Sequence, residues 1–358
     1  MDSLLHEWPE PIVAVQSIAE SGATLIPVDY VKPAADRPAV AGTTAARELS
    51  IPIIDLGKLK TGVVDFYAVI REISDACREW GFFQVVNHGV DNELVNAVMG
   101  VWREFFHLPM EEKKKLANSP VTYEGYGSRL GVEKGGALDW GDYFYLHILP
   151  HSVKNYDKWP NVPSACREIT EEYGRQMVSL CDTVMKVLSI DLGFDVGFLK
   201  ERFGGEDIGT CMRVNYYPKC PQPELTLGLS AHSDPGGLTV LVADHEVPGL
   251  QVREGSAWVN VSPAPNALIV NVGDQIQVLS NATYKSVEHR VLANAVQERL
   301  SIAFFYNPKN DLPLEPVKEL VTHERPQLYR AMTFSEYRLY IRKKGPRGKT
   351  QVESLEAM

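Results

Sequence analysis

The sequence lacks a long apolar run. None of its 358 residues fall in a stretch of roughly 18 or more uncharged apolar residues, the length that a transmembrane helix needs. Its first twenty residues, MDSLLHEWPEPIVAVQSIAE, carry acidic groups where a secretory signal would have a basic end and an apolar segment. We therefore expect a cytoplasmic protein, with the nucleus as a second possible compartment.

Cysteine is scarce, and an excess of positive charge is absent. The five cysteines are widely spaced and form neither a CxxC metal motif nor an even-numbered disulfide framework, so we interpret them as reduced structural thiols. Lys and Arg total 36 against 46 Asp and Glu, a formal net charge of −10. This balance disfavours binding to nucleic acid or to an anionic membrane, which leaves a small molecule as the expected partner. The oligomeric state is left open.

The remaining composition is that of an ordinary folded protein. With 44% hydrophobic residues, the chain is long enough to bury a core without disulfides or structural metals. Its texture divides into four segments. They are an N-terminal extension (1–50), a mainly helical region (51–200), a β-rich region (201–310), and a C-terminal helix with a tail (311–358).

Hydrophobic periodicity predicts an α+β fold. Helical spacing occurs over 64–80, over 93–116 with an interruption at Pro109, and over 164–192, and helical texture returns over 314–345. Short β-type runs between turn residues predict a barrel or jelly roll after residue 208. The expected strands are 51–56, 82–90, TCMRVNYYP (210–218), GLTVLVA (237–243), GLQVRE (249–254), AWVNV (257–261), ALIVNV (267–272), QIQVLS (275–280), EHRVLA (288–293) and RLSIAFFYNP (299–308).

His232 and Asp234 form the first candidate constellation. If they lie in a strand, their side chains share a face, and an imidazole beside a carboxylate can bind a divalent metal. His289, in a second strand-like run, supplies a third ligand, and two histidines with one carboxylate match the facial triad of non-haem Fe(II) oxygenases. Such a pair alone is more often a hydrogen-bonded core pair, so the surrounding residues have to decide. The other histidines considered, His107, His147, His151 and His245, are interpreted as structural or surface residues.

Arg299 and Ser301 form the second constellation. They share a strand face within a run that is apolar on both sides, which predicts a buried strand. A buried arginine requires an anionic partner, and a guanidinium with a hydroxyl suits the far carboxylate of a dicarboxylic acid. The alternative is a surface arginine on an edge strand.

Arg213, Asn215 and Tyr217 form the third constellation. By the same alternation all three side chains share one face of a strand. They predict the lining of a pocket. Judged only by the polar residues on one strand face, the exposed face of an antiparallel sheet is a more common explanation of the pattern than a pocket.

Together these motifs resemble the plant 2-oxoglutarate/Fe(II)-dependent dioxygenases, with further likeness in IPIIDL, WGFFQVVNHGV, GDQIQVLSN and YKSVEHRV. The resemblance implies a double-stranded β-helix (jelly roll) flanked by helices. It implies that His232, Asp234 and His289 bind Fe(II), that Arg299 and Ser301 hold 2-oxoglutarate with help from Tyr217, and that Asn215 lies near the chelating end. It also implies O2 as a reactant and ascorbate as a reductant.

Further segments resemble the jasmonate-induced oxygenases, the jasmonic acid hydroxylases of plants. They are WPEPIVAVQSIAESG, TYEGYGSRLGVEKG, LDWGDYFYLHILP and FGGEDIG. The resemblance implies 2-oxoglutarate-dependent hydroxylation of jasmonic acid at its 12 position, which weakens jasmonate signalling and defence.

The residues are compatible with such a substrate. Arg213 shares the Asn215 face, and Arg338 and Arg342 are four apart on the C-terminal helix, so we expect the three to bind the carboxylate and ketone. Phe305 and Tyr145 are expected as apolar walls. A solvated basic helix end is an equal alternative for Arg338 and Arg342, and core packing for the two aromatics. The Gly- and Tyr-rich stretch 122–131 is compatible with a mobile lid or with an ordinary surface loop.

Other functions compete with this prediction, and gibberellin oxidation is one that the three arginines do not exclude. Another is a flavonoid-oxidising dioxygenase of the anthocyanidin synthase or flavonol synthase type, although a neutral polyphenol does not need three arginines. A third is a non-catalytic or Zn-binding jelly roll, which would have no need to keep metal and cosubstrate residues together.

Overall fold

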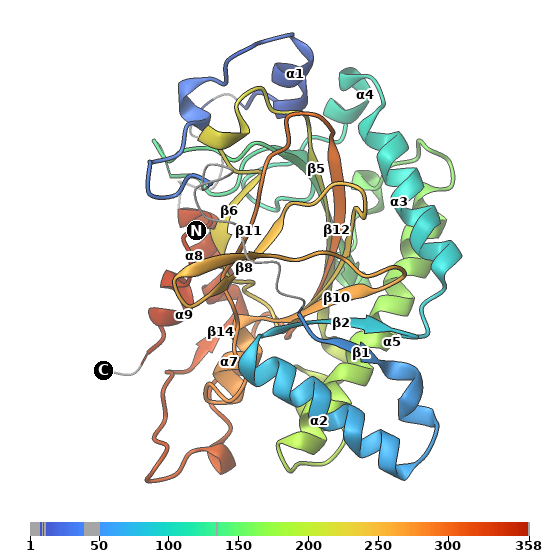
Figure 1. Cartoon of the computed structure of the whole chain (residues 1–358), viewed down its shortest axis with the longest axis vertical. Coiled ribbons are helices and arrows are strands. Elements are labelled where there is room, and N and C mark those ends of the chain that lie inside the picture. The colour runs from blue at the N-terminus through green and yellow to red at the C-terminus, as the bar shows by residue number, and fades with distance from the viewer. Residues whose placement is uncertain (1–7, 9, 11, 39–50, 134, 357–358) are drawn as a thin grey trace.

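The computed structural model describes residues 8, 10, 12–38, 51–133 and 135–356. Two β-sheets face each other, and helices cover the outside of the larger one (Figure 1). Of the N-terminal extension expected over residues 1–50, residues 39–50 lie outside the described part of the chain. Among the helices described, none is long and apolar enough to cross a membrane.

The larger sheet has eight strands and combines strands from the first and second halves of the chain. In spatial order they are β1 (Ile53–Asp55), β2 (Phe82–Val86), β10 (Leu268–Val272), β7 (Leu238–Ala243), β12 (Arg299–Asn307), β5 (Gly209–Tyr217), β4 (Asp142–Leu149) and β3 (Gly125–Gly127). The segments 51–200 and 201–310 therefore share one sheet.

The smaller sheet has four strands and carries two of the three candidate metal ligands. Its spatial order is β6 (Leu229–His232), β11 (His289–Val291), β8 (Leu250–Glu254) and β9 (Ala257–Asn260). The tail after the last long helix joins its edge, because Gly348 forms an isolated bridge with His232. A separate two-stranded sheet pairs β13 (Pro313–Leu314) with β14 (Met332–Thr333).

Alternation along the central strands separates the core from the site. On β12, Leu300, Ile302 and Phe304 belong to the main hydrophobic core, while Arg299 and Ser301 line a cavity on the opposite face. Strand β5 has the same division. Its residues Met212, Val214 and Tyr216 belong to the core, and Arg213, Asn215 and Tyr217 line the cavity. The expected sharing of faces is thus confirmed, and the polar faces of β5 and β12 point toward the cavity inside the molecule.

Helices cover the outer face of the larger sheet. The long helix α5 (Cys166–Asp191) packs against α2 (Val63–Glu79), α3 (Asn92–Phe106), β7 and β12. Figure 1 shows α2, α3 and α5 outside the sheet. These helices match the periodicity of the sequence. The interruption at Pro109 is real, since α4 (Met110–Lys114) begins just after it. The other helices are α1 (Val15–Glu20), α6 (Phe198–Arg202), α7 (Asp274–Leu279), α8 (Phe334–Lys344) and α9 (Thr350–Glu353).

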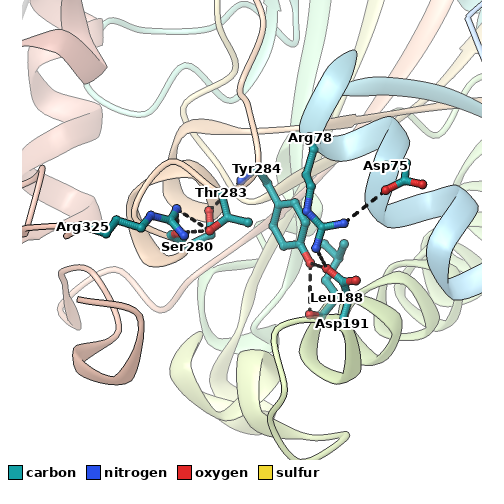
Figure 2. A network of polar contacts seen from close by, with 8 residues as sticks. All are labelled: Asp75, Arg78, Leu188, Asp191, Ser280, Thr283, Tyr284 and Arg325. Atoms are coloured by element: carbon teal, nitrogen blue, oxygen red, sulfur yellow. Dashed lines mark hydrogen bonds and ion pairs between the residues drawn. The ribbon is translucent and has the colours of Figure 1, made fainter. Parts of the chain in front are cut away.

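A polar network joins the helical layer to the segment after α7 (Figure 2). Asp191, at the end of α5, pairs with Arg78 of α2 and accepts a hydrogen bond of 2.5 Å from the hydroxyl of Tyr284. Arg325 donates to the backbone carbonyl of Ser280 at 3.2 Å in the same region. Partly buried, charge-assisted bonds of this kind help to fix the orientation of the elements they join.

Two predictions about local structure were wrong. QIQVLS was expected as a strand, but it lies in helix α7, all of whose residues are buried. Because every face of this helix is covered, its sequence shows no helical stripe. The second concerns 314–345, because α8 begins only at Phe334. Before it, the structure has the end of β13, a short 3-10 helix at Lys318–Leu320, and β14.

The stretch 122–131 is built into the fold. It contains β3, which pairs with β4, and residues 123–127 are buried. A side chain at Gly125 would collide with the carbonyl oxygen of Leu116, and one at Gly127 would collide with the side chain of Asn118. In this structure the stretch forms a wall beside α8.

Candidate active site

His232, Asp234 and His289 come together between the two sheets. Their potential ligand atoms lie within 4.8 Å of one another, close enough to hold one metal ion. Strand pairing explains part of this, because His232 of β6 lies directly opposite His289 of β11. Asp234 follows the end of β6, so it reaches the site from a loop and not from the strand that the sequence suggested.

The histidines are oriented for binding a metal. Nδ1 of His232 lies 2.8 Å from the carbonyl oxygen of Ser230, and Nδ1 of His289 lies 3.2 Å from that of Val287. Each Nε2 lies 3.7 Å from Oδ1 of Asp234. Burial, together with the nearby His289, lowers the pKa of His232 to about 4, so its imidazole is neutral near neutral pH.

The second oxygen of Asp234 is already engaged. Oδ2 accepts hydrogen bonds from Thr239 Oγ1 at 2.6 Å and from Asn271 Nδ2 at 2.7 Å. Burial opposes ionisation, but the two histidines and these two donors hold the pKa of Asp234 below its usual value. Sequence reasoning missed both donors, although each lies in a run that was expected as a strand.

Arg299 and Ser301 form one end of a narrow cavity that contains the metal site. Arg299 is 3% exposed, donates to Ser301 Oγ at 3.3 Å, and lies over the ring of Tyr217 at 5.5 Å. Within the described part of the chain, Arg299 forms no ion pair. A buried guanidinium without an anion is suited to a ligand carboxylate.

Arg213 and Asn215 place unsatisfied polar atoms in the same cavity. Nε of Arg213 and Oδ1 of Asn215 are buried and have no hydrogen-bond partner within the described ranges of the chain. The Arg213 guanidinium stacks over the ring of Tyr143 at 4.3 Å, a contact the sequence did not reveal. Buried polar atoms without partners are uncommon and point to a missing ligand or water.

A second, more apolar cavity of about 170 Å³ adjoins the metal site. The two cavities share Arg213, His232, Asp234 and Phe305 in their linings. The second one also includes Tyr145 and, from α8, Arg338 and Arg342. The predicted substrate residues are therefore gathered around one space next to the predicted metal ligands.

The arginines of α8 are held by neutral groups. Arg338 donates to the hydroxyl of Tyr145 at 3.1 Å, and Arg342 donates to the carbonyl oxygen of Val121 at 3.0 Å. In the described residues neither forms an ion pair with a carboxylate. Burial and the proximity of Arg338 lower the pKa of Arg342, as expected for two cations that lack an anion between them. Both arginines are half-buried, which does not fit a solvated helix end.

Family models match both halves of the chain. The model described as the 2OG-Fe(II) oxygenase superfamily matches residues 208–308, and that of the non-haem dioxygenase in morphine synthesis N-terminal matches residues 51–162. Jasmonate-induced oxygenase 2 of Arabidopsis thaliana is 57% identical over 98% of this chain and 94% of the relative. The chain belongs to the jasmonate-induced oxygenase family.

The chain is also similar to a solved structure and, at lower identity, to a flavonoid enzyme. A crystal structure of JOX2 in complex with 2OG, Fe and JA matches with a TM-score of 0.92 and 56% identity, and covers 98% of this chain and 100% of that one. Flavanone 3-dioxygenase 2 of Oryza sativa subsp. japonica is 42% identical over 87% of this chain and 89% of the relative. The family assignment confirms the predicted jelly-roll fold.

As a member of this family, the protein is an Fe(II)/2-oxoglutarate-dependent dioxygenase. Its site is chemically suited to both groups. Two imidazoles and a carboxylate suit Fe(II), and a metal held by three protein ligands would keep positions for a chelating cosubstrate. Arg299, which is buried and has no counter-ion in the part of the chain that the structure describes, suits the far carboxylate of 2-oxoglutarate.

Proposed function

We propose that this protein hydroxylates jasmonic acid at its 12 position and so lowers the supply of the hormone for signalling and defence. One observation carries the proposal. Arg213, Arg338 and Arg342, without carboxylate partners among the described residues, line an otherwise mainly apolar cavity that adjoins His232 and Asp234. A small carboxylic acid with an apolar chain has the complementary chemistry. The JOX2 structure, which contains JA, supports the same substrate.

His232, Asp234 and His289 are assigned as the Fe(II) ligands, and Arg299 and Ser301 as the residues that bind the distal carboxylate of 2-oxoglutarate. Tyr217 lies opposite Arg299 in the strand register and supports its guanidinium, and Asn215 offers its unpartnered carbonyl near the metal end. When bound, iron with 2-oxoglutarate and O2 supplies the oxidising chemistry. The protein's part is to bind, orient and exclude water.

The three arginines are assigned to the carboxylate and ring ketone of the substrate. Phe305 and Tyr145 face the same cavity and form part of its wall. Anchoring the polar end at the arginines places the apolar chain of the substrate toward the metal. Ascorbate as reductant and a cytoplasmic location complete the proposal.

The test is product analysis with purified enzyme, Fe(II), ascorbate, 2-oxoglutarate and either jasmonic acid or a panel of flavonoids. We expect succinate in equal amount to a jasmonate that has gained one oxygen, at the 12 position by fragmentation. Succinate coupled only to a flavonoid would refute the substrate. An Arg338→Ala variant should lose affinity for jasmonic acid, whereas exposed Arg175→Ala on α5 is the matched control.

A further inference from the structure

The carboxylate of Asp234 is divided between two tasks. Oδ1 faces the two histidines at 3.7 Å from each Nε2, while Oδ2 is turned away toward Thr239 and Asn271. All three residues of this contact are at most 4% exposed, so bulk water competes little for the bonds. An ionised acceptor shortens and strengthens such bonds, in line with their lengths of 2.6 and 2.7 Å.

The two donors are neighbours on adjacent strands. Thr239 lies on β7 and Asn271 on β10, and the strand register places them directly opposite each other. They therefore reach the carboxylate from the larger sheet, whereas His232 and His289 belong to the smaller one. Both strands are paired on each side within the sheet, and directly opposite residues of such strands stabilise each other.

The backbone of Asp234 is fixed as well. Its carbonyl oxygen accepts a hydrogen bond of 2.8 Å from the amide of Asp274, and the amide of Gly273 donates to Gly237 at 2.7 Å. A Cβ at Gly273 would lie 2.3 Å from the carbonyl oxygen of Gly236, so this close approach requires glycine. Asp234 is thus held at its main chain by the amide of Asp274 and at its carboxylate by Thr239 and Asn271.

We propose that Thr239 and Asn271 are positioning residues that keep Asp234 a one-oxygen ligand. Without them the carboxylate is free to rotate and to offer both oxygens to the metal. The second oxygen would then occupy a position that the cosubstrate needs. This inference rests on the proposed role of Asp234 as a metal ligand and is independent of the identity of the substrate.

The decisive measurement is a titration of metal-free enzyme with Mn(II), in which electron paramagnetic resonance detects the bound ion. It is made with and without 2-oxoglutarate. Thr239→Val removes the hydroxyl and keeps the shape. We expect it to weaken Mn(II) binding in the presence of 2-oxoglutarate by about tenfold, the usual cost of losing a partner of a metal ligand. Asn271→Ala should act in the same direction. Thr239→Ser, which keeps the hydroxyl, should bind Mn(II) nearly as the wild type does.

Thr210→Val is the matched control. Thr210 lies on β5 and is 1% exposed, and its hydroxyl has no hydrogen-bond partner among the residues the structure describes. The same substitution there should leave Mn(II) affinity unchanged. Thermal unfolding of the metal-free variants shows whether each is folded.

Asp234→Ala distinguishes a failure of the proposed metal site from a failure of the positioning role of Thr239 and Asn271. If Asp234→Ala keeps wild-type Mn(II) affinity, the proposed metal site fails. If Asp234→Ala loses affinity while Thr239→Val and Asn271→Ala retain it, the metal site stands and the positioning role is refuted.

Discussion

Arg338 on α8 donates a hydrogen bond of 3.1 Å to the hydroxyl of Tyr145 on β4. Tyr145 was expected as an apolar wall, yet its polar atom holds a proposed substrate-binding arginine in place. The ring of His147 packs edge-on against Tyr145 at 5.2 Å and limits its movement. The wall and the binding group therefore form one unit.

Tyr145→Phe tests this contact. Removing the hydroxyl leaves the ring in place but lets Arg338 move, and a hydrogen bond to a charged group contributes about 1.5 kcal/mol or more. We expect the KM for jasmonic acid to rise roughly tenfold, with kcat and the KM for 2-oxoglutarate little changed. Tyr340→Phe, on the exposed side of the same helix, is the control. An equal effect from both substitutions would contradict the role given to Tyr145.

Arg299→Ala is expected to raise the 2-oxoglutarate requirement far more than the jasmonic acid requirement. The guanidinium is buried beside Ser301 and has no carboxylate partner among the described residues, so its loss removes the expected anchor of the distal carboxylate. Initial rates with each substrate varied in turn give the two KM values. A comparable rise in both would remove the basis for the assignment.

Metal should stabilise the wild type and not a variant that lacks a ligand. A ligand that binds only the folded state at about a hundred times its Kd adds about 2.7 kcal/mol to the free energy of unfolding. We expect Mn(II) to raise the Tm of the wild type and to leave that of His232→Ala unchanged, and His232→Ala should also abolish turnover. Exposed His245→Ala should behave as the wild type. A normal Mn(II) shift in His232→Ala would show that the metal binds elsewhere.

His147 should make the folded state sensitive to acid. Burial, with Arg338 and Arg342 nearby, lowers its pKa to about 3 from a usual value of 6.5. Between these pH values the unfolded chain binds a proton at this position and the folded chain does not, so stability falls as pH falls from 6.5 toward 3. In His147→Gln the loss of unfolding free energy between pH 7 and pH 5, measured in urea, should be smaller. Identical pH dependence in both proteins would contradict the prediction.

The sequence by itself determined the local patterns. Alternation of two predicted that Arg299 and Ser301 share a face, as do Arg213 and Asn215, because strand geometry leaves no other arrangement. Periods of three and four predicted α2 and α5. The resemblance to the plant 2-oxoglutarate/Fe(II)-dependent dioxygenases implied that the two histidines and the aspartate form one set.

Only the tertiary structure decided which residues from distant parts of the chain contact one another. The pairing of β6 with β11 places His232 opposite His289, and the pairing of β7 with β10 builds the Thr239–Asn271 contact to Asp234. These contacts join residues far apart in the chain, and neither propensity nor spacing encodes them. The same limit explains α7, whose buried surroundings on every side override the strand-like alternation of its sequence. Local rules fix which face a side chain takes, and packing between distant elements fixes what lies across from it.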